Sequence, residues 1–369
     1  MTAGDGTRCV RAGLPPAAPG APLLPGPVFA APYHLDPDGP GDHPDTYART
    51  DNPTRRGFEA AVGELEGGTA VAYASGLAAI TGALLAVLRS GDTVVLPADG
   101  YFSVPQFGAE TLAPFGVTVR TAPTAGPVPD LAGVKLVLVE APANPRLDVP
   151  DLPAIVAAAR ASGTLVAVDN TAATPLGLRP LDHGADLVLA SGTKALSGHS
   201  DLLIGYAATR DPALAALLRA RREHSGAVPG PFDCWLAHRS LATLDLRLAR
   251  QTANAAAVAA LLAARPEVTG VRWPGRPGDP AHERAAALLR RMPGIVAAEL
   301  PDAAHVTRLL RHSALAVSAT SFGGLHTSVD RRRVWGEAVP EGFVRISCGV
   351  EDTADLVADL AAALDAARG

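Results

Sequence analysis

The sequence predicts an α/β domain with a mostly parallel central sheet, followed by a smaller C-terminal α+β domain. Three observations predict this arrangement. Continuous apolar runs such as TVVLP and KLVLVE have the length of buried strands. Helical segments alternate with these runs, which is typical of a parallel sheet covered on both faces. Beyond residue 228 the alternation gives way to a long helical stretch and to shorter, scattered strands.

The first domain, predicted over residues 51–228, begins with the helix FEAAVGELE, which Gly67 and Gly68 end. A strand, AVAYAS, and an apolar helix that runs up to Gly91 come next. The later elements alternate in the same way: strand TVVLPAD, a helix near 103–113, strands VTVRTAP and KLVLVEAP, helix 151–162, and strands TLVAVDN and ADLVLAS. Each strand is short and apolar throughout, so we expect it to be buried in the sheet.

The second domain, predicted over residues 229–369, starts with one long helix or two consecutive helices within 231–264. Its strands are expected at VTGVRWP, IVAAELPD, ALAVSAT and FVRISCGVE, with helices near 280–291, 304–312 and 352–367. Residues 1–50 precede both domains. Up to about residue 46 they are rich in proline, glycine and alanine, so we expect an extended arm rather than a folded unit.

Composition and charge exclude several classes of function. The chain has 369 residues, 48% of them hydrophobic, and a net charge of -5 from 32 basic and 37 acidic residues. No basic stripe points to nucleic acid, and no apolar run is long enough to span a membrane. Cys9, Cys234 and Cys348 lie far apart, which favours neither a disulfide framework nor a metal site. The N-terminus lacks the apolar core of a signal peptide, so we expect a cytoplasmic protein.

Polar side chains follow the apolar strands, where open parallel sheets bind their ligands. Ser75, Gly76 and Leu77 open a helix, and free N–H groups at a helix start favour an anion. The other strands are followed by an aromatic ring, an amide, a carboxylate, hydroxyls and a lysine, on Tyr101, Asn144, Asp169, Ser191, Thr193 and Lys194. Lysine is rare in this chain, and Lys194 stands among small and polar neighbours rather than among charges.

Pyridoxal 5'-phosphate (PLP) suits this set of side chains. It needs a lysine for its aldehyde, a carboxylate for its ring nitrogen, a cup for its phosphate and a ring to stack on. Burial lowers the pKa of a lysine and so favours the nucleophilic amine. Taken singly, Lys194 is as compatible with a solvated surface, Asp169 with a turn and Tyr101 with the core. Their succession at neighbouring strand ends predicts the cofactor.

The chain resembles the Cys/Met-metabolism family of PLP-dependent enzymes, which includes cystathionine γ-lyases, γ-synthases and β-lyases and methionine γ-lyases. The stretches that carry the resemblance lie between residues 46 and 352: TYARTDNPT, ASGLAAI, EAPANPRLDV, VAVDNTAATP, SGTKALSGHSDLLIG, TSFGG and VRISCGVED. The resemblance implies the type I fold of PLP-dependent transferases, as in aspartate aminotransferase. It also implies a homo-oligomer, a dimer of dimers, with active sites shared between subunits.

The resemblance also implies roles for individual residues in the cofactor site. Lys194 would bind the cofactor covalently and then carry protons, Asp169 would pair with the pyridinium nitrogen, and Tyr101 would stack on the ring. Asn144 would lie near the ring hydroxyl. The phosphate would be held by the N–H groups and hydroxyls of Gly76, Leu77, Ser191 and Thr193. Tyr47 and Arg49 would reach the phosphate of a neighbouring subunit.

Substrate recognition is the part in which the sequence departs from the family. Arg345 would hold the α-carboxylate of an amino-acid substrate by a two-pronged ion pair, assisted by Ser321. Family members usually carry a longer stretch before this arginine, which residues 325–342 shorten or replace here. Thr320 stands where γ-lyases and γ-synthases commonly carry glutamate. Both departures concern the substrate side chain rather than the cofactor.

The function implied is a PLP-dependent reaction at the γ-carbon of an amino acid. The first expectation is a cystathionine γ-lyase that releases cysteine, 2-oxobutanoate and ammonia. The alternatives are γ-replacement of the cystathionine γ-synthase type and a specialised lyase of secondary metabolism with a non-sulfur leaving group. A cofactor-dependent regulator or an inactive scaffold is the non-enzymatic alternative, against which Lys194 and Asp169 argue. No metal is expected.

Overall fold

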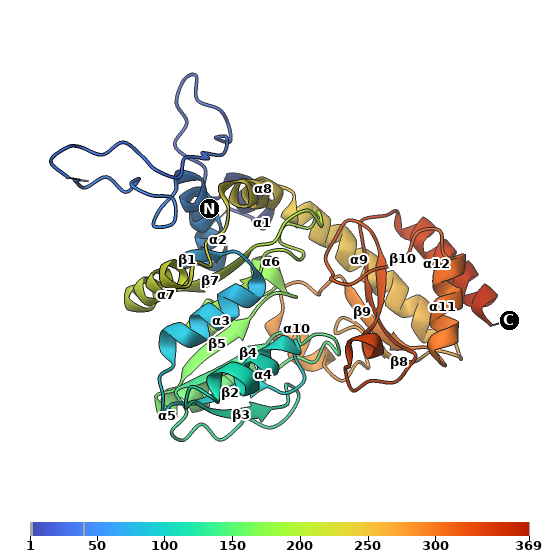
Figure 1. Ribbon diagram of the computed structural model, residues 1–369. Coiled ribbons are helices and arrows are strands. Elements are labelled where there is room, and N and C mark those ends of the chain that lie inside the picture. Colours follow the sequence, from blue (N-terminus) through green and yellow to red (C-terminus); the bar gives the residue numbers. More distant parts are fainter. Residues whose placement is uncertain (1–2, 40, 369) are drawn as a thin grey trace.

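The computed structural model describes residues 3–39 and 41–368, and its central feature is a seven-stranded sheet (Figure 1). The strands lie in the order β1-β7-β6-β5-β4-β2-β3. Their bounds are Thr69–Tyr73 (β1), Thr93–Pro97 (β2), Thr118–Ala122 (β3), Leu136–Glu140 (β4), Leu165–Asp169 (β5), Leu187–Ser191 (β6) and Gly205–Thr209 (β7). β7 is antiparallel to both of its neighbours, whereas the other pairs are parallel. The predicted mostly parallel sheet is therefore confirmed.

Helices cover both faces of this sheet, as the alternation of elements predicts. α3 (Gly76–Val87) and α7 (Pro212–Ser225) pack on one face, and α2 (Pro53–Glu66) and α5 (Leu152–Ser162) pack on the other. Shorter helical turns complete the domain: α4 (Ser103–Phe107), the π-helix η1 (Gly108–Leu112), α6 (Thr174–Gly177) and the 3-10 helix η2 (Pro180–His183).

Three details of this domain differ from the expectation. The apolar helix that was expected to run to Gly91 ends at Val87, because the Arg89 N–H donates to the Asp92 carboxylate in the turn that follows. β7 and α7 had not been predicted. The sequence GYAAT of β7 begins with a glycine and carries little bulk, so its apolar signal is weak, although the strand is buried throughout.

A second sheet of five strands lies in the C-terminal part, in the order β10-β11-β12-β9-β8. Its strands are Thr269–Arg272 (β8), Ile295–Glu299 (β9), Val317–Ser318 (β10), Ser328–Arg331 (β11) and Phe343–Ser347 (β12). The helices of this part are α8 (Pro231–Leu241), α9 (Leu244–Ala263), α10 (His282–Leu288), α11 (Ala303–His312), α12 (Thr353–Ala367) and the 3-10 helix η3 (Arg332–Trp335). The stretch 231–264 thus forms two helices. β11 and η3 were not predicted, and they occupy the segment in which the sequence departs from its family.

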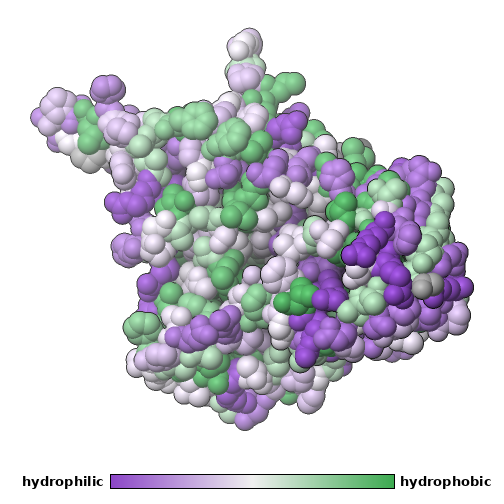
Figure 2. Space-filling model, turned by 45° about the vertical axis from the view of Figure 1, so that its right-hand side comes forward, coloured by the Kyte–Doolittle hydropathy of each residue, from purple (hydrophilic) through white to green (hydrophobic). Residues whose placement is uncertain are grey.

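The N-terminal arm is partly helical, which corrects the expectation of an entirely extended segment. α1 (Asp5–Arg11) packs against α2 and α9, and Cys9 is buried with Phe58 and Leu244 in the same core cluster. The sequence did not predict α1 because Cys9 is its one buried side chain, which is too little for a periodic hydrophobic pattern. Beyond α1 the chain forms loops that project from the molecule (Figure 1), and Figure 2 shows hydrophobic surface on this projection. Leu23 and Phe29 are 93% and 65% exposed there.

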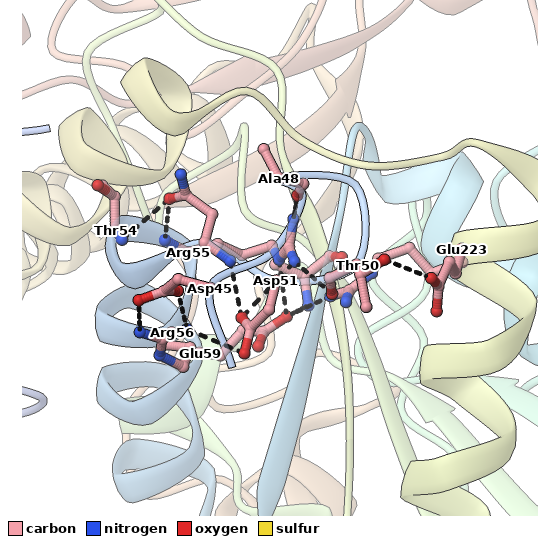
Figure 3. A network of polar contacts seen from close by, with 12 residues as sticks. Asp45, Ala48, Thr50, Asp51, Thr54, Arg55, Arg56, Glu59 and Glu223 are labelled. Carbon is pink, nitrogen blue, oxygen red and sulfur yellow. Dashed lines mark hydrogen bonds and ion pairs between the residues drawn. The ribbon is translucent and has the colours of Figure 1, made fainter. Parts of the chain in front are cut away.

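The base of the arm is fixed to α2 by buried and half-buried charges (Figure 3). Arg55, which is 1% exposed, donates to the carbonyl oxygens of Ala48 and Thr50, both at 2.8 Å. Arg56 pairs with Asp45 at 2.7 Å and with Asp51 at 2.9 Å. The backbone that carries Tyr47 and Arg49 is therefore held in place by its own chain.

None of the helices within residues 3–39 and 41–368 is both long and apolar enough to cross a membrane.

Candidate active site

A cavity of about 350 Å³ lies where the carboxyl ends of β4, β5 and β6 meet the second sheet. Twelve of the residues that the sequence singled out line it: Ser75, Gly76, Leu77, Tyr101, Asn144, Asp169, Ser191, Thr193, Lys194, Thr320, Ser321 and Arg345. Further lining residues, which the sequence analysis did not select, include Glu140, Thr171, Phe322, Arg332 and Trp335. Residues that are more than 200 positions apart in the chain therefore share one cavity.

Lys194 is held at the junction of the two sheets. Its Nζ donates to Ser321 Oγ at 2.6 Å and lies 5.4 Å from the centroid of the Phe322 ring. Ser321 has a φ of 77°, in the left-handed region that side chains other than glycine seldom adopt. Gly323 lets the segment that carries Ser321 lie close to the backbone next to Lys194, since a Cβ on Gly323 would lie 2.6 Å from the Ala195 Cα. Burial lowers the pKa of Lys194 to about 8, and the charges of Arg345 and Arg332 act in the same direction.

We expect the capture of PLP by the cofactor-free protein to follow this lowered pKa. The neutral amine attacks the aldehyde, so the rate of capture should rise with pH through about 8 and level off above it. An ordinary lysine would keep gaining reactivity toward about pH 10. Stopped-flow absorbance measures the rate of capture, and Lys135→Arg is the control that should leave the midpoint of the pH profile unchanged.

The lowered pKa of Lys194 also affects stability. Between about pH 8 and pH 10.5 the unfolded chain binds more protons at this lysine than the folded chain does. The free energy of unfolding should therefore rise as pH rises through this range, because the cost of burying the charged amine is lost.

Asp169 ends β5 with its carboxylate directed into the cavity. Its Oδ1 accepts from the Thr171 N–H at 3.0 Å and from Thr171 Oγ1 at 2.5 Å, whereas Oδ2 has no donor among the described residues. Burial raises the pKa of Asp169, and the two bonds from Thr171 oppose this effect. A cationic N–H beside Oδ2 would offset the cost of burying the charge. The protonated ring nitrogen of PLP would be such a cationic N–H donor.

Glu140 is a second buried carboxylate, directly opposite Asp169 in the β4–β5 pair. Its two oxygens accept from the backbone N–H groups of Asn144 at 2.9 Å and of Tyr101 at 2.7 Å. Burial raises the pKa of Glu140 well above its usual range, and the charge of Asp169 adds to this effect. Glu140 thus joins two strand ends that the sequence analysis treated separately. The signal was present, because a glutamate ends the otherwise apolar strand LVLVE.

The start of α3 forms another part of the cavity, which suits an anion. Within the described chain the N–H groups of Gly76 and Leu77 have no acceptor, and Ser75 Oγ accepts from the Ala78 N–H at 3.1 Å. A Cβ on Gly76 would lie 2.7 Å from Ser191 Oγ, so only glycine leaves this space open. The Thr193 hydroxyl instead donates to the Ile204 carbonyl at 3.1 Å. The free N–H groups and the Ser191 hydroxyl fit a phosphate.

Arg345 on β12 forms the third part of the cavity. Its Nη1 donates to Asn144 Oδ1 at 2.5 Å, and its Nη2 donates to the Ser321 carbonyl at 2.7 Å and to Asp330 Oδ2 at 2.9 Å. Nε is buried and has no partner among the described residues. Burial lowers the pKa of Arg345 to about 10, and the charge of Arg332 acts in the same direction. An unpaired N–H of a buried guanidinium favours a further anionic partner.

Tyr47 and Arg49 do not join this cavity in their own chain. Both lie on the base of the arm, where the Arg49 guanidinium stacks on the Tyr47 ring at 5.6 Å from its centroid. Tyr47 is 48% exposed. The resemblance to the family implies that these two residues serve a neighbouring subunit, which stays a prediction.

Comparison with known proteins identifies the family. The sequence pattern of the family described as "Cys/Met metabolism PLP-dependent enzyme" matches residues 37–365. The chain belongs to this family of PLP-dependent enzymes. A Streptomyces coelicolor protein provisionally named a cystathionine gamma-lyase is 52% identical, over 98% of this chain and 94% of that protein. The cystathionine gamma-synthase of Mycobacterium bovis is 37% identical, over 98% and 97% of the two chains. The cystathionine gamma synthase structure from Xanthomonas oryzae pv. oryzae matches with a TM-score of 0.93 at 32% identity, covering 100% of this chain and 99% of that one.

Membership of the Cys/Met-metabolism family makes the chain a PLP-dependent enzyme of the carbon–sulfur lyase class with the fold type expected. The residues in the cavity fit the cofactor. Lys194 offers an amine, Asp169 has a free oxygen for a cationic ring nitrogen, and the start of α3 offers two N–H groups for a phosphate. The sequence prediction of the family, the cofactor and the fold is confirmed.

Proposed function

We propose that the protein catalyses γ-elimination on an amino acid, with cystathionine as its first candidate substrate and cysteine, 2-oxobutanoate and ammonia as products. The observation that carries this proposal is the convergence of Lys194, Asp169 and Arg345 on one cavity. A lysine that moves protons and a guanidinium that holds a carboxylate are what an amino-acid reaction at this cofactor requires. The 52% identity to a protein named as a cystathionine gamma-lyase supports elimination as the outcome.

The proposed mechanism assigns one task to each part of the cavity. Bound PLP withdraws electrons from the α-carbon of the substrate. Arg345 binds the α-carboxylate with the N–H groups it has free, while Asn144 and the Ser321 carbonyl fix the plane of its guanidinium. Lys194, with its lowered pKa, takes the α-proton and returns protons to the substrate, and Ser321 Oγ positions its Nζ. Asp169 would pair with the ring nitrogen of the bound cofactor, whose positive charge would favour the ionised carboxylate.

A second candidate, γ-replacement of the cystathionine γ-synthase type, is supported by the relatives named cystathionine gamma-synthase. A third candidate, a lyase with a non-sulfur leaving group, is supported by Thr320. This residue lines the cavity with a hydroxyl at the position where γ-lyases and γ-synthases commonly carry glutamate.

A substrate panel separates these candidates. Purified protein is incubated with cystathionine, methionine, O-succinylhomoserine and a γ-halogenated amino acid, with and without cysteine, while 2-oxo acid and ammonia are measured. The proposed lyase should give most 2-oxo acid from cystathionine. Preferential formation of cystathionine from O-succinylhomoserine and cysteine would instead establish γ-replacement.

We further propose that active sites are shared between subunits of a homo-oligomer, a dimer of dimers. Tyr47 and Arg49 are exposed, are held by Arg55 and Arg56 to their own chain, and lie on a projection with exposed apolar side chains. Such a projection would be stabilised by covering it with another subunit. A cytoplasmic location and the boundaries at residues 50 and 228 stay predictions.

Mixing two defective variants tests the shared site. Arg49→Ala and Lys194→Ala should each be poorly active alone, and unfolding and refolding them together should restore activity. Some sites of the hybrid then combine Lys194 of one chain with Arg49 of the other, up to about one quarter of the wild-type level for a random dimer. Mass spectrometry of the intact assemblies verifies the hybrids. Hybrids without activity would show that each chain completes its own site.

A further inference from the structure

Asp330 on β11 links the guanidinium of Arg345 to the indole of Trp335. Its Oδ2 accepts from Arg345 Nη2 at 2.9 Å and from Arg332 Nη1 at 2.6 Å, and its Oδ1 accepts from Trp335 Nε1 at 2.9 Å. Asp330 is 5% exposed. Both oxygens of one buried carboxylate are therefore used, one toward Arg345 and one toward Trp335, the last residue of η3.

Local structure fixes this geometry. Asp330 and Arg345 are directly opposite in the antiparallel β11–β12 pair, so their side chains share a face. η3 begins immediately after β11, and Gly336 ends it with a φ of 82°. Arg332 pairs with Glu337 across this turn as well as with Asp330. The segment in which the sequence departs from its family, residues 325–342, thus contains a tight turn stabilised by ion pairs, and this turn places the Trp335 indole next to β11.

Trp335 contributes an indole ring to the cavity wall, and Arg332 of the same helix, η3, lines the cavity as well. Trp335 is 50% exposed, and Phe102 and Leu203, which also line the cavity, are 40% and 65% exposed. The lining carboxylates, Glu140 and Asp169, lie at the ends of β4 and β5 in the first domain, whereas Trp335 lies in the second. An indole wall recognises a substrate side chain by its size and apolar surface.

We propose that Trp335 determines which substrate side chains the enzyme accepts and that Asp330 is a positioning residue that holds this wall at a fixed place relative to Arg345. The proposal rests on the proposed function, in that Arg345 binds the α-carboxylate. The distance from the α-carboxylate to the wall is then set by a single carboxylate. Substrates with the same α-end but different groups beyond the γ-carbon are ranked by their fit against Trp335.

The first test compares substrates that differ only beyond the γ-carbon. Methionine and ethionine share their α-end and differ by one methylene group, and cystathionine adds a charged end. Trp335→Ala should change the ratio of kcat/KM between two of these substrates by about tenfold, as expected for a wall that contacts one of them more closely. Trp235→Ala is the matched control, because its indole donates to the Pro25 carbonyl at 2.9 Å and does not line the cavity. An unchanged ratio in Trp335→Ala would overturn the role of the wall.

The second test asks whether Asp330 acts through Trp335. Trp335→Phe keeps an aromatic ring but removes the N–H donor, and Asp330→Asn removes the charge that two guanidinium groups share. In a double-mutant cycle on the logarithm of the substrate ratio, the two changes should be strongly non-additive, with the double variant close to the more severe single variant. Additive effects would show that Asp330 does not position the indole.

A third measurement does not depend on turnover. The emission of Trp335 is obtained as the difference between the wild-type protein and Trp335→Phe, with and without the Asp330→Asn change. Loss of the tether should shift this difference spectrum to longer wavelength and increase its quenching by iodide. No shift and no added quenching would overturn the tether. Failure of the wild-type protein to convert any substrate would contradict the proposed function, whereas the emission result would still decide whether Asp330 holds Trp335.

Discussion

Asp169→Asn is expected to leave the fold and much of the bound cofactor intact while lowering turnover by about a hundredfold or more. The amide retains the bonds from Thr171 through its oxygen but cannot carry the negative charge that a protonated ring nitrogen requires. The ring then withdraws electrons less effectively, so the loss should appear in kcat rather than in cofactor content. Steady-state kinetics, the visible spectrum and the melting temperature measure the three quantities.

Asp186→Asn is a suitable control for this change. Asp186 precedes β6 in the same sheet, and its carboxylate accepts from the Val166 N–H at 2.8 Å, at the end of β5 opposite to Asp169. Asp186→Asn should likewise leave the fold intact, but its turnover should be nearly unchanged. Nearly normal turnover in Asp169→Asn itself would show that Asp169 is a structural residue of the strand end.

Arg345→Ala is expected to weaken all amino-acid substrates alike, by about 2–5 kcal/mol in kcat/KM. Every substrate presents the same α-carboxylate, and the deletion would leave this group buried without its cation. Asp330 would still be paired with Arg332, so we expect the β11–β12 region to remain folded. The measurement is kcat/KM for several substrates, with the ratio between substrates as the informative quantity.

Arg333→Ala serves as the control for Arg345→Ala. Arg333 lies on η3 close to the same segment, but its half-exposed side chain pairs with Glu341 and does not line the cavity. It should leave kcat/KM nearly unchanged. A large change in the ratio between substrates in Arg345→Ala would indicate that Arg345 contacts the substrate side chain instead of the α-carboxylate.

The cofactor side of the cavity could be predicted from the sequence because its geometry follows from strand order. Asp169 and Lys194 each follow an apolar strand, and parallel strands bring their carboxyl ends to one edge. The positions of such residues can be predicted without knowing how the loops fold. The strands could be predicted because they are apolar throughout, whereas β7 was not predicted because its residues, GYAAT, are small and weakly apolar.

The substrate side could be predicted only in part. Arg345 was identified by its family motif, but its partners depend on how β11 pairs with β12 and on where η3 turns. Arg332 and Trp335 lie in a stretch of charged and turn-forming residues that has no hydrophobic period to locate it. Glu140 accepts hydrogen bonds from the backbone N–H groups of Tyr101 and Asn144. Because these bonds do not involve the side chains of Tyr101 and Asn144, they cannot be predicted from the types of those two residues.

Borohydride reduction followed by peptide mass spectrometry tests the central claim most directly. The sequence contains two lysines, Lys135 and Lys194, so the assignment is nearly binary. Native protein loaded with PLP and then reduced should carry the cofactor on the peptide that contains Lys194, with one label for each chain, and denatured protein should show no such preference. Label on Lys135, or no label on native protein that has been exposed to the cofactor, would contradict the account of this cavity as the active site.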